Sequence, residues 1–563
     1  MNSALLTVGA LILLALGYHF YGRFVERRCV EPDPDAKTPA FALRDGVDYE
    51  PGNPYMLFGH HFTNIAGAGP IVGPVIAVAY FGWAATLGWI VVGTIFIGGV
   101  HDYLSLMMSA RNQGKSISDI AGRLVGKRAS VVMGLFLWLS LILIIAMFGI
   151  LAAQTLITAP SVVIPNAGLI AVAMVIGLAI YRWRQPLWVV TIFGAVLLGL
   201  LLWAGYVRPL QLPAALGDPF TIWFGILMLY CLLASVLPIW FLEQPRDYLS
   251  SKLMVVGIGL GFVAIFAASA PVSAPAHVDL VSKQGPIWPM LFILVACGAV
   301  SGFHALVAGG TTVKQLASEK QALPIAYGSM VLEAAQAISV TFLVAAGLYW
   351  AGSHVGPDGK SLVLLDLMES PEGGGPAVAF IRGFASLTNR GLPVIPFEAG
   401  VLAAAIVLNA TLLDTLDTCT RLGRFVLTET FGDRIAPLRS RWLAGIITVA
   451  PAVYLGLSGA GKFLWPVFGA ANQLIAALAF LVIAVYLVGV GKPTIYTVIP
   501  GIFILLTTVA ALLYQGYALL FGDSPNYVLG AICASLIGLA IYVSGEAVPR
   551  LRYIATPLKT AAK

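Results

Sequence analysis

The chain has 563 residues, of which 59% are apolar and only 10% are charged. Soluble domains carry roughly 25% charged residues, so this composition and a mean hydropathy of +0.90 exclude a water-facing surface over most of the chain. The net charge of +6 lies on no basic soluble domain, and we therefore expect no nucleic-acid partner. Five scattered cysteines without a CxxC pair predict neither a disulfide framework nor a zinc site.

Apolar runs recur from one end of the chain to the other. A helix needs about 20 apolar residues to cross a bilayer, and this criterion predicts an all-α membrane protein of about 15 transmembrane helices. The predicted spans are 3–22, 56–80, 84–109, 130–157, 165–182, 187–207, 219–243, 253–272, 288–310, 323–351, 394–420, 441–458, 462–488, 494–517 and 526–546. We interpret the first as a retained helix rather than a signal peptide, because basic residues follow it and none precedes it.

The basic residues predict the orientation of these spans. With the N-terminus outside and the C-terminus in the cytoplasm, 26 of the 32 basic residues lie in inward connections and six in outward ones, as the positive-inside rule requires. The two sizeable connections are residues 23–55, inside, and 352–393, outside. The second is rich in glycine and proline and is predicted to be a surface loop.

The second span is interrupted by residues that disfavour a continuous helix. Three glycines and two prolines lie between residues 67 and 74; proline removes a backbone donor, and glycine permits irregular dihedrals. One interpretation is a kink filled by neighbouring helices. The functional interpretation is an unwound helix at a binding site. There Pro70 would begin an outer half-helix whose free N–H groups face an anion, while carbonyls around Ala66 coordinate a cation.

A second interruption is predicted at residues 234–248, five spans later and in the opposite direction. Two such breaks would arise from an inverted five-helix repeat. The predicted organisation is an N-terminal helix and cytoplasmic loop (1–55), a first repeat (56–207), a second repeat (219–420), accessory C-terminal helices (441–546) and a cytoplasmic tail (547–563).

Ionisable residues inside predicted spans are costly and suggest function. His101 and Asp102 lie on the third span, His304 on the ninth, and Glu333 near the middle of the tenth, with no basic neighbour in its own helix. Glu333 is therefore our preferred proton carrier.

Other ionisable residues have a simpler alternative, a buried ion pair that only holds the helices together. Asp414 and Asp417 share a face of the eleventh span, with Arg421 one turn from Asp417. We expect Glu243, Arg246 and Asp247 at the inner edge, where water reaches. In the thirteenth span, the amides of Asn472 and Gln473 are expected to hold helices together.

Six segments in this order resemble the carbon starvation protein A (CstA) family, over about residues 55 to 490. They are FGHHFTNIAGAGPIVGP (58–74), HDY (101–103), QPRDYL (244–249), GTTVKQ (310–315), DTCTR (417–421) and WPVFGAANQ (465–473). The resemblance implies a secondary transporter of bacterial inner membranes, related to the amino acid–polyamine–cation superfamily, with LeuT-like inverted repeats. It also implies ion-driven uptake of peptides or pyruvate when carbon is scarce.

The predicted mechanism is alternating access around the two breaks. The predicted substrate-binding residues are His60, His61, Asn64, Gly67, Gly69, Ser235, Trp240 and His304. The predicted ion-coupling residues are Ala66, Thr311, Thr312, Asp102, Glu333, Asp414 and Asp417. The coupling ion is sodium or a proton, and no cofactor or firm metal site is predicted.

Two rival functions remain. A haem- or metal-binding membrane enzyme would use His60, His61, His101 and His304 as ligands, and a passive channel would conduct without accumulation. The substrate, small carboxylate or peptide, and the oligomeric state are left open.

Overall fold

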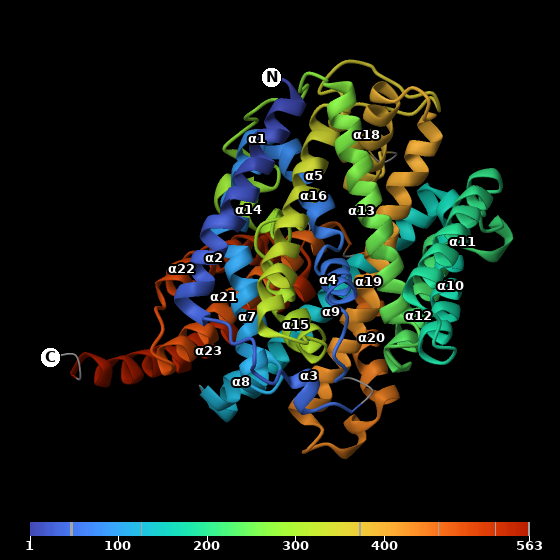
Figure 1. Cartoon of the computed structure of the whole chain (residues 1–563). Coiled ribbons are helices and arrows are strands. Elements are labelled where there is room, and N and C mark those ends of the chain that lie inside the picture. Colours follow the sequence, from blue (N-terminus) through green and yellow to red (C-terminus); the bar gives the residue numbers. More distant parts are fainter. Residues whose placement is uncertain (46–48, 125, 371–372, 460, 524, 561–563) are drawn as a thin grey trace.

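The computed structural model describes residues 1–45, 49–124, 126–370, 373–459, 461–523 and 525–560. Among these residues, twelve helices are long and apolar enough to cross a membrane, or thirteen if one bent pair is a single span. The other regular structure includes a short hairpin of β1 (Val281–Ser282) and β2 (Gly285–Pro286). The protein is therefore an all-α, multi-pass membrane protein (Figure 1).

The α-helices follow one another along the whole chain. Those before residue 270 are α1 (Ser3–Leu16), α2 (Arg23–Val25), α3 (Pro39–Ala42), α4 (Pro54–Ile65), α5 (Gly69–Phe81), α6 (Trp83–Gly93), α7 (Gly99–Arg111), α8 (Ile117–Leu124), α9 (Lys127–Thr158), α10 (Val163–Tyr181), α11 (Leu187–Val207), α12 (Pro219–Val236) and α13 (Glu243–Ala268). Those after it are α14 (Ile287–Leu294), α15 (Phe303–Gly310), α16 (Gly328–Ala345), α17 (Leu364–Glu369), α18 (Gly375–Gly391), α19 (Phe397–Phe431), α20 (Arg441–Leu457), α21 (Gly461–Gly489), α22 (Ile495–Phe521) and α23 (Tyr527–Thr560).

Each predicted span falls on one of these helices or on a pair of them. Two of the fifteen, 288–310 and 441–458, fall on helices that are too short to count as full spans, namely α14, α15 and α20. The predicted number of fifteen therefore remains a prediction.

The predicted break in the second span is present. Helices α4 and α5 meet at an angle of 41°, and Ala66 between them has a non-helical backbone (φ −82°, ψ 53°). Pro70 occupies the first turn of α5, where its missing N–H costs no helical hydrogen bond.

The second discontinuous helix lies elsewhere than predicted. The interruption at 234–248 is the turn between two separate helices, α12 and α13. The break is instead at residues 295–302, between α14 and α15. In Figure 1 the pair α4–α5 ascends and the pair α14–α15 descends, so the two discontinuous helices run in opposite directions.

The two discontinuous helices touch along their backbones. Helix α14 packs on α5, and α15 packs on α4. A Cβ atom added to Gly73 would lie 2.5 Å from the carbonyl oxygen of Leu294, and one added to Gly69 would lie 2.2 Å from Cβ of Cys297. Glycine is needed at these positions because no side chain fits between the two helical segments.

The remaining helices surround this pair. Helices α9, α12, α19 and α20 contact one another, as do α21, α22 and α23. The hairpin of α10 and α11 lies at the right-hand edge of Figure 1, where most of α11 is exposed. These contacts place both breaks in the interior of the bundle.

The prediction of a surface loop at residues 352–393 is wrong. Its second half forms α18, which packs between α13, α16 and α19 and buries residues such as Phe380 and Phe384. The glycine- and proline-rich stretch directly precedes an amphipathic helix. The composition of that stretch led to the prediction of a loop, although the helix after it has an apolar face. Part of that stretch, residues 371–372, lies outside the described residues.

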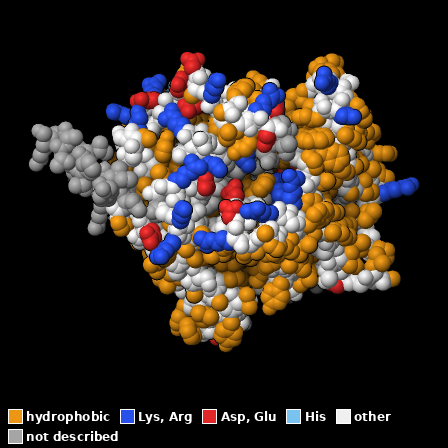
Figure 2. Space-filling model, turned by 90° about the horizontal axis from the view of Figure 1, so that it is seen from below, with side chains coloured by type: hydrophobic (Ala, Val, Ile, Leu, Met, Phe, Trp, Pro, Cys, Tyr) orange, Lys and Arg blue, Asp and Glu red, His pale blue; other side chains and the backbone are white. Residues whose placement is uncertain are grey.

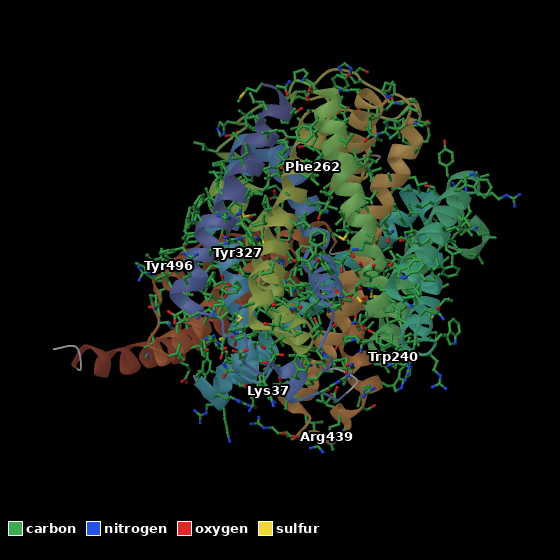
Figure 3. All side chains as sticks on the ribbon, viewed as in Figure 1. Lys37, Trp240, Phe262, Tyr327, Arg439 and Tyr496 are labelled. Carbon is green, nitrogen blue, oxygen red and sulfur yellow. The ribbon has the colours of Figure 1, made fainter. Side chains whose placement is uncertain are left out.

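One end of the molecule is rich in charge. Figure 2 shows Lys and Arg side chains, with some Asp and Glu, gathered on the lower face, and an apolar surface beside them. Lys37 and Arg439 lie at this lower end in Figure 3, whereas the N-terminus lies at the upper end in Figure 1.

Candidate functional site

A small closed cavity lies where the two discontinuous helices meet. It is lined by Ile65, Gly67, Gly69, Ile144, Phe148, Cys297, Phe303, Thr415, Phe468 and Asn472. Its volume is about 10 Å³, which is close to the space that one water molecule needs. The structure is therefore a closed form, and a solute can enter only if the surrounding helices move.

The start of α5 carries free backbone donors beside this cavity, which Gly69 lines. The N–H groups of Ala68 and Gly69 have no hydrogen-bond acceptor in the described part of the chain, while Ile71 and Val72 donate to the carbonyl of Ala68. Free N–H groups at a helix N-terminus favour an anion. The lining side chains carry no charge, so these donors are the cavity's main attraction for a carboxylate.

The second break is held by a side chain from a distant helix. The Oδ1 atom of Asn472 on α21 accepts a hydrogen bond of 2.8 Å from the N–H of Phe303, the first residue of α15. Its Nδ2 atom donates to Ser301, at 3.0 Å. Gln473 donates to the carbonyl of Phe292, at 2.6 Å. These amides hold helices together as predicted, and they do so by satisfying backbone that the break releases.

Four buried ionisable side chains form a chain beside the second break. The Nδ1 atom of His101 lies 2.9 Å from Oδ1 of Asp102, whose Oδ2 lies 2.7 Å from Nδ1 of His304. The Nε2 atom of His304 lies 3.3 Å from Oε2 of Glu333. All four side chains are completely buried. We call this set the His304 chain; it joins α7, α15 and α16.

A second buried network surrounds the guanidinium of Arg246 on α13. This group contacts Asp247, Asp414 and Asp417. The Oδ2 atom of Asp247 also lies 2.9 Å from Nδ1 of His60 and accepts a hydrogen bond of 3.0 Å from Asn64. We call this set the Arg246 network; it ties α4 to α13 and α19.

The structure corrects two expectations about these charges. Arg421 pairs with Glu243 at 2.7 Å, and not with Asp417 in its own helix. Glu243, Arg246 and Asp247 are buried rather than exposed at a wet inner edge. Sequence spacing alone could not reveal that α13 lies against α19.

Of the other predicted site residues, His61 and Asn64 contact other segments, whereas Thr311 bonds within its own helix. His61 contacts Thr312 on the α15 side at 2.8 Å, and the hydroxyl of Thr418 donates to Asn64 at 2.5 Å. In contrast, Thr311 donates to the carbonyl of Val307 in its own helix.

Ser235 and Trp240 do not reach the cavity. The hydroxyl of Ser235 donates to the carbonyl of Leu232 in its own helix. The ring centre of Trp240 lies 5.8 Å from that of Tyr181, toward the lower right edge of Figure 3 and away from the breaks. Both were predicted as ligands because the turn between α12 and α13 was interpreted as a broken helix.

Sequence reasoning missed several lining residues. Phe148, Cys297, Thr415 and Phe468 are ordinary apolar or small residues in predicted spans. Tyr230, which donates to Asp417 at 3.0 Å, was also missed. The glycines at 298 and 302 were the available signal for the second break.

A second cavity of about 80 Å³ lies below the first. Helices α9, α15 and α19 border both cavities. Leu137, Leu306 and Leu422 are among the residues that line the second one. At its mouth, the ammonium of Lys314 lies 5.4 Å from the ring centre of Tyr49 and 5.3 Å from that of Phe425. Residues 50 and 52 of the preceding loop donate backbone hydrogen bonds to Lys314 and Gln315.

The predicted histidine ligands are engaged in polar contacts. In each of His60, His61, His101 and His304, Nδ1 lies within 3 Å of an aspartate or threonine oxygen. Among the described residues, no group of three or more His, Cys, Asp or Glu side chains is arranged to hold a metal ion.

Known proteins resemble this chain over most of its length. A peptide transporter CstA from Campylobacter jejuni is 33% identical over 580 residues, which cover 90% of this chain and 79% of that protein. The pyruvate/proton symporter BtsT from Escherichia coli is 31% identical over 590 residues, which cover 90% of this chain and 81% of that protein.

The fold of this chain resembles that of solved structures. A manganese transporter from Eremococcus coleocola superposes with a TM-score of 0.51 at 11% identity, covering 91% of this chain and 99% of that chain. The fold is thus LeuT-like, as the opposed discontinuous helices indicate. The model of the family described as carbon starvation protein CstA matches residues 2–356 and 367–511. The chain therefore belongs to the carbon starvation protein CstA family.

Proposed function

We propose that this protein is a proton-coupled symporter that imports a small carboxylate, such as pyruvate, or a peptide across the bacterial inner membrane during carbon starvation. The observation that carries this proposal is the closed cavity between two opposed discontinuous helices, with free N–H groups at Ala68 and Gly69. Relatives with the names peptide transporter and pyruvate/proton symporter support it.

The substrate carboxylate would bind at the start of α5. A carboxylate shares the geometry that helix N-termini recognise, and pyruvate and a peptide C-terminus both present one. Because the cavity is now about 10 Å³, binding requires an opening of the bundle. Alternating access through movement of the discontinuous helices would supply it.

The proton would bind at the His304 chain. This chain has two carboxylates, Asp102 and Glu333, and no lysine or arginine among its contacts. Two buried carboxylates without a fixed cation cannot both be ionised at reasonable cost. A proton held there would lie next to the cavity, because His304 directly follows Phe303, which lines it. Sodium is the alternative coupling ion.

We propose the orientation with the N-terminus outside and the C-terminus in the cytoplasm. The concentration of basic side chains on the lower face supports it (Figure 2), since inward loops of membrane proteins are rich in Lys and Arg. We also propose that the two inverted repeats begin at α4 and at α14, rather than at residues 56 and 219. The opposite directions of these helix pairs support this division.

The test is uptake of labelled pyruvate and of labelled dialanine into proteoliposomes of the purified protein. A proton gradient and a sodium gradient are imposed in turn. We expect accumulation above the external concentration under the proton gradient only. Protein-free vesicles and vesicles with a proton ionophore serve as controls.

Each other outcome points to a different function. Accumulation under sodium alone would overturn the choice of ion. Equilibration without accumulation in tight vesicles would indicate a channel. No flux of either solute would overturn the transport proposal for these substrates, and a visible absorption band in the purified protein would then favour a haem or metal enzyme.

A further inference from the structure

The Arg246 network contains more negative than positive groups. The guanidinium of Arg246 lies 3.2 Å from Asp247, 2.7 Å from Asp414 through Nε, and 2.9 Å from Asp417 through Nη2. All four side chains are 0% exposed. One cation therefore faces three carboxylates inside the membrane domain.

The neighbouring groups do not balance this excess completely. Arg421 on α19 is paired with Glu243 on α13. From α12, Tyr230 supplies a neutral hydroxyl to Asp417, and from α13, Ser250 supplies one to Asp414 at 3.2 Å. The thiols of Cys231 on α12 and Cys419 on α19 also lie near Asp417, and His60 on α4 contacts Asp247.

The residual charge is best assigned to Asp414. Asp247 has contacts from Arg246, His60 and Asn64, and Asp417 has two guanidinium nitrogens and the hydroxyl of Tyr230. The Oδ2 atom of Asp414, by contrast, is buried and has no hydrogen-bond partner in the described part of the chain. A negative charge on an oxygen in that position would be costly, and burying the neutral, protonated carboxyl group costs far less.

We propose that Asp414 is a second proton-binding site, separate from the His304 chain, so that two protons enter with each substrate molecule. This inference rests on the proposed function. Asp414 accepts the proton from the outer side when the site is open outward and releases it to the cytoplasm when the site is open inward.

The position of Asp414 explains how this proton is linked to transport. The next residue, Thr415, lines the substrate cavity, where Gly67 allows it to approach. Arg246 connects Asp414 to Asp247, and Asp247 holds α4 through His60 and Asn64. Loss of the proton from Asp414 strengthens its attraction for Arg246 and weakens the hold of Arg246 on Asp247. The contact with α4 thus changes with the protonation of Asp414.

Two protons with one monovalent anion carry one net positive charge inward, and two with a neutral peptide carry two. The experiment is accumulation of labelled pyruvate, or of dialanine if only the peptide is transported, in proteoliposomes at a fixed pH gradient. The membrane potential is set by potassium and valinomycin. For pyruvate we expect about tenfold more accumulation for each ~59 mV of inside-negative potential; for dialanine we expect about hundredfold.

In the variant Asp414→Asn, one proton fewer should enter with each substrate molecule. Pyruvate accumulation should then respond to the pH gradient but not to the potential, and dialanine accumulation should change only about tenfold per ~59 mV. Asp433→Asn, which changes an aspartate on an exposed inner loop, should behave as wild type.

The outcomes separate this inference from the proposed function. Wild-type pyruvate uptake that ignores the potential would overturn the second proton without affecting symport, and this result does not depend on any variant folding. An unchanged stoichiometry in folded Asp414→Asn would overturn the assignment to Asp414. Failure of the wild type to accumulate either solute under a proton gradient would overturn the proposed function, and with it this inference.

Discussion

The Nδ1 atom of His304 lies 2.7 Å from Oδ2 of Asp102, and both side chains are completely buried. His304 belongs to the first turn of the half-helix α15, and Asp102 belongs to the continuous helix α7. The contact therefore joins a discontinuous helix, whose movement we propose for transport, to a helix beside it. Glu333 lies on the other side of the same imidazole.

We expect Glu333→Gln to lower accumulation driven by a proton gradient, because only the proton at Asp414 would then enter with the substrate. The amide cannot exchange a proton, so the His304 chain would no longer tie substrate movement to the gradient. Exchange of labelled for unlabelled substrate at equal concentrations should persist. The measurement compares both assays in proteoliposomes. Glu369→Gln, a change at the end of the short helix α17, is the matched control, and full accumulation by Glu333→Gln would exclude Glu333 as the carrier.

We expect Gly69→Ala to reduce both stability and uptake. The new Cβ would lie 2.2 Å from Cβ of Cys297, so the two discontinuous helices would have to separate. Overpacking of this kind costs about 1–3 kcal/mol. The measurement is thermal unfolding in detergent together with initial uptake rates.

Two further variants test the cause of that loss. Gly88→Ala is the control, because nothing lies within 4 Å of the Cβ position at Gly88. Adding Cys297→Gly to Gly69→Ala should restore part of the stability, since it removes the atoms that clash. No recovery in the double variant would show that the contact is not the cause.

We expect Asn472→Leu to destabilise the protein more than Ser301→Ala. The first change removes the acceptor for the N–H of Phe303 and the donor to Ser301, whereas the second removes only one side-chain partner. A buried polar group left without its partner costs about 1–3 kcal/mol. Thermal unfolding of the two purified variants measures the order, and equal losses would contradict the capping role of Asn472.

The ion pair of Asp358, in the segment between α16 and α17, with Arg382 on α18 predicts a pH dependence of stability. Two hydrogen bonds of 2.7 and 2.8 Å from Arg382 lower the pKa of the Asp358 carboxyl below its ordinary value. The stabilisation is therefore present above the pKa of the unfolded chain, about 3.9, and is lost as the pH falls through the lower folded-state pKa.

The measurement compares the unfolding temperatures of wild type and Asp358→Asn between pH 7 and pH 3. We expect wild type to be more stable near pH 7 and the two curves to converge toward pH 3. A constant difference over this range would mean that the charge of Asp358 does not contribute to stability.

The sequence predicted the features that depend on local composition. Runs of apolar residues are enough to locate helices in a bilayer, and the glycines and prolines of 67–74 were enough to locate the break after Ile65. The side chains of His60, His61 and Asn64 are buried toward the end of α4, and their role as substrate ligands stays a prediction.

Features that depend on distant partners were not predictable in this way. Residues 295–302 contain no proline and form part of a continuous apolar run, and their unwinding is stabilised by Asn472, about 170 residues later. Likewise, the partner of Asp417 is Arg246 on α13 rather than the nearby Arg421, because helix packing, and not spacing along the chain, decides which charges meet.

The loop before α4 has a consequence for the role of the first helix. Tyr49 borders the lower cavity, and the backbone of residues 50–52 is bonded to the chain just beyond α15. The segment that connects α1 to the first discontinuous helix is thus part of the wall of the lower cavity. A shortened protein that began at α4 would keep both breaks, the His304 chain and the Arg246 network but would lack this part of the cavity wall. The N-terminal helix therefore spans the membrane and also holds in place a segment that borders the lower cavity.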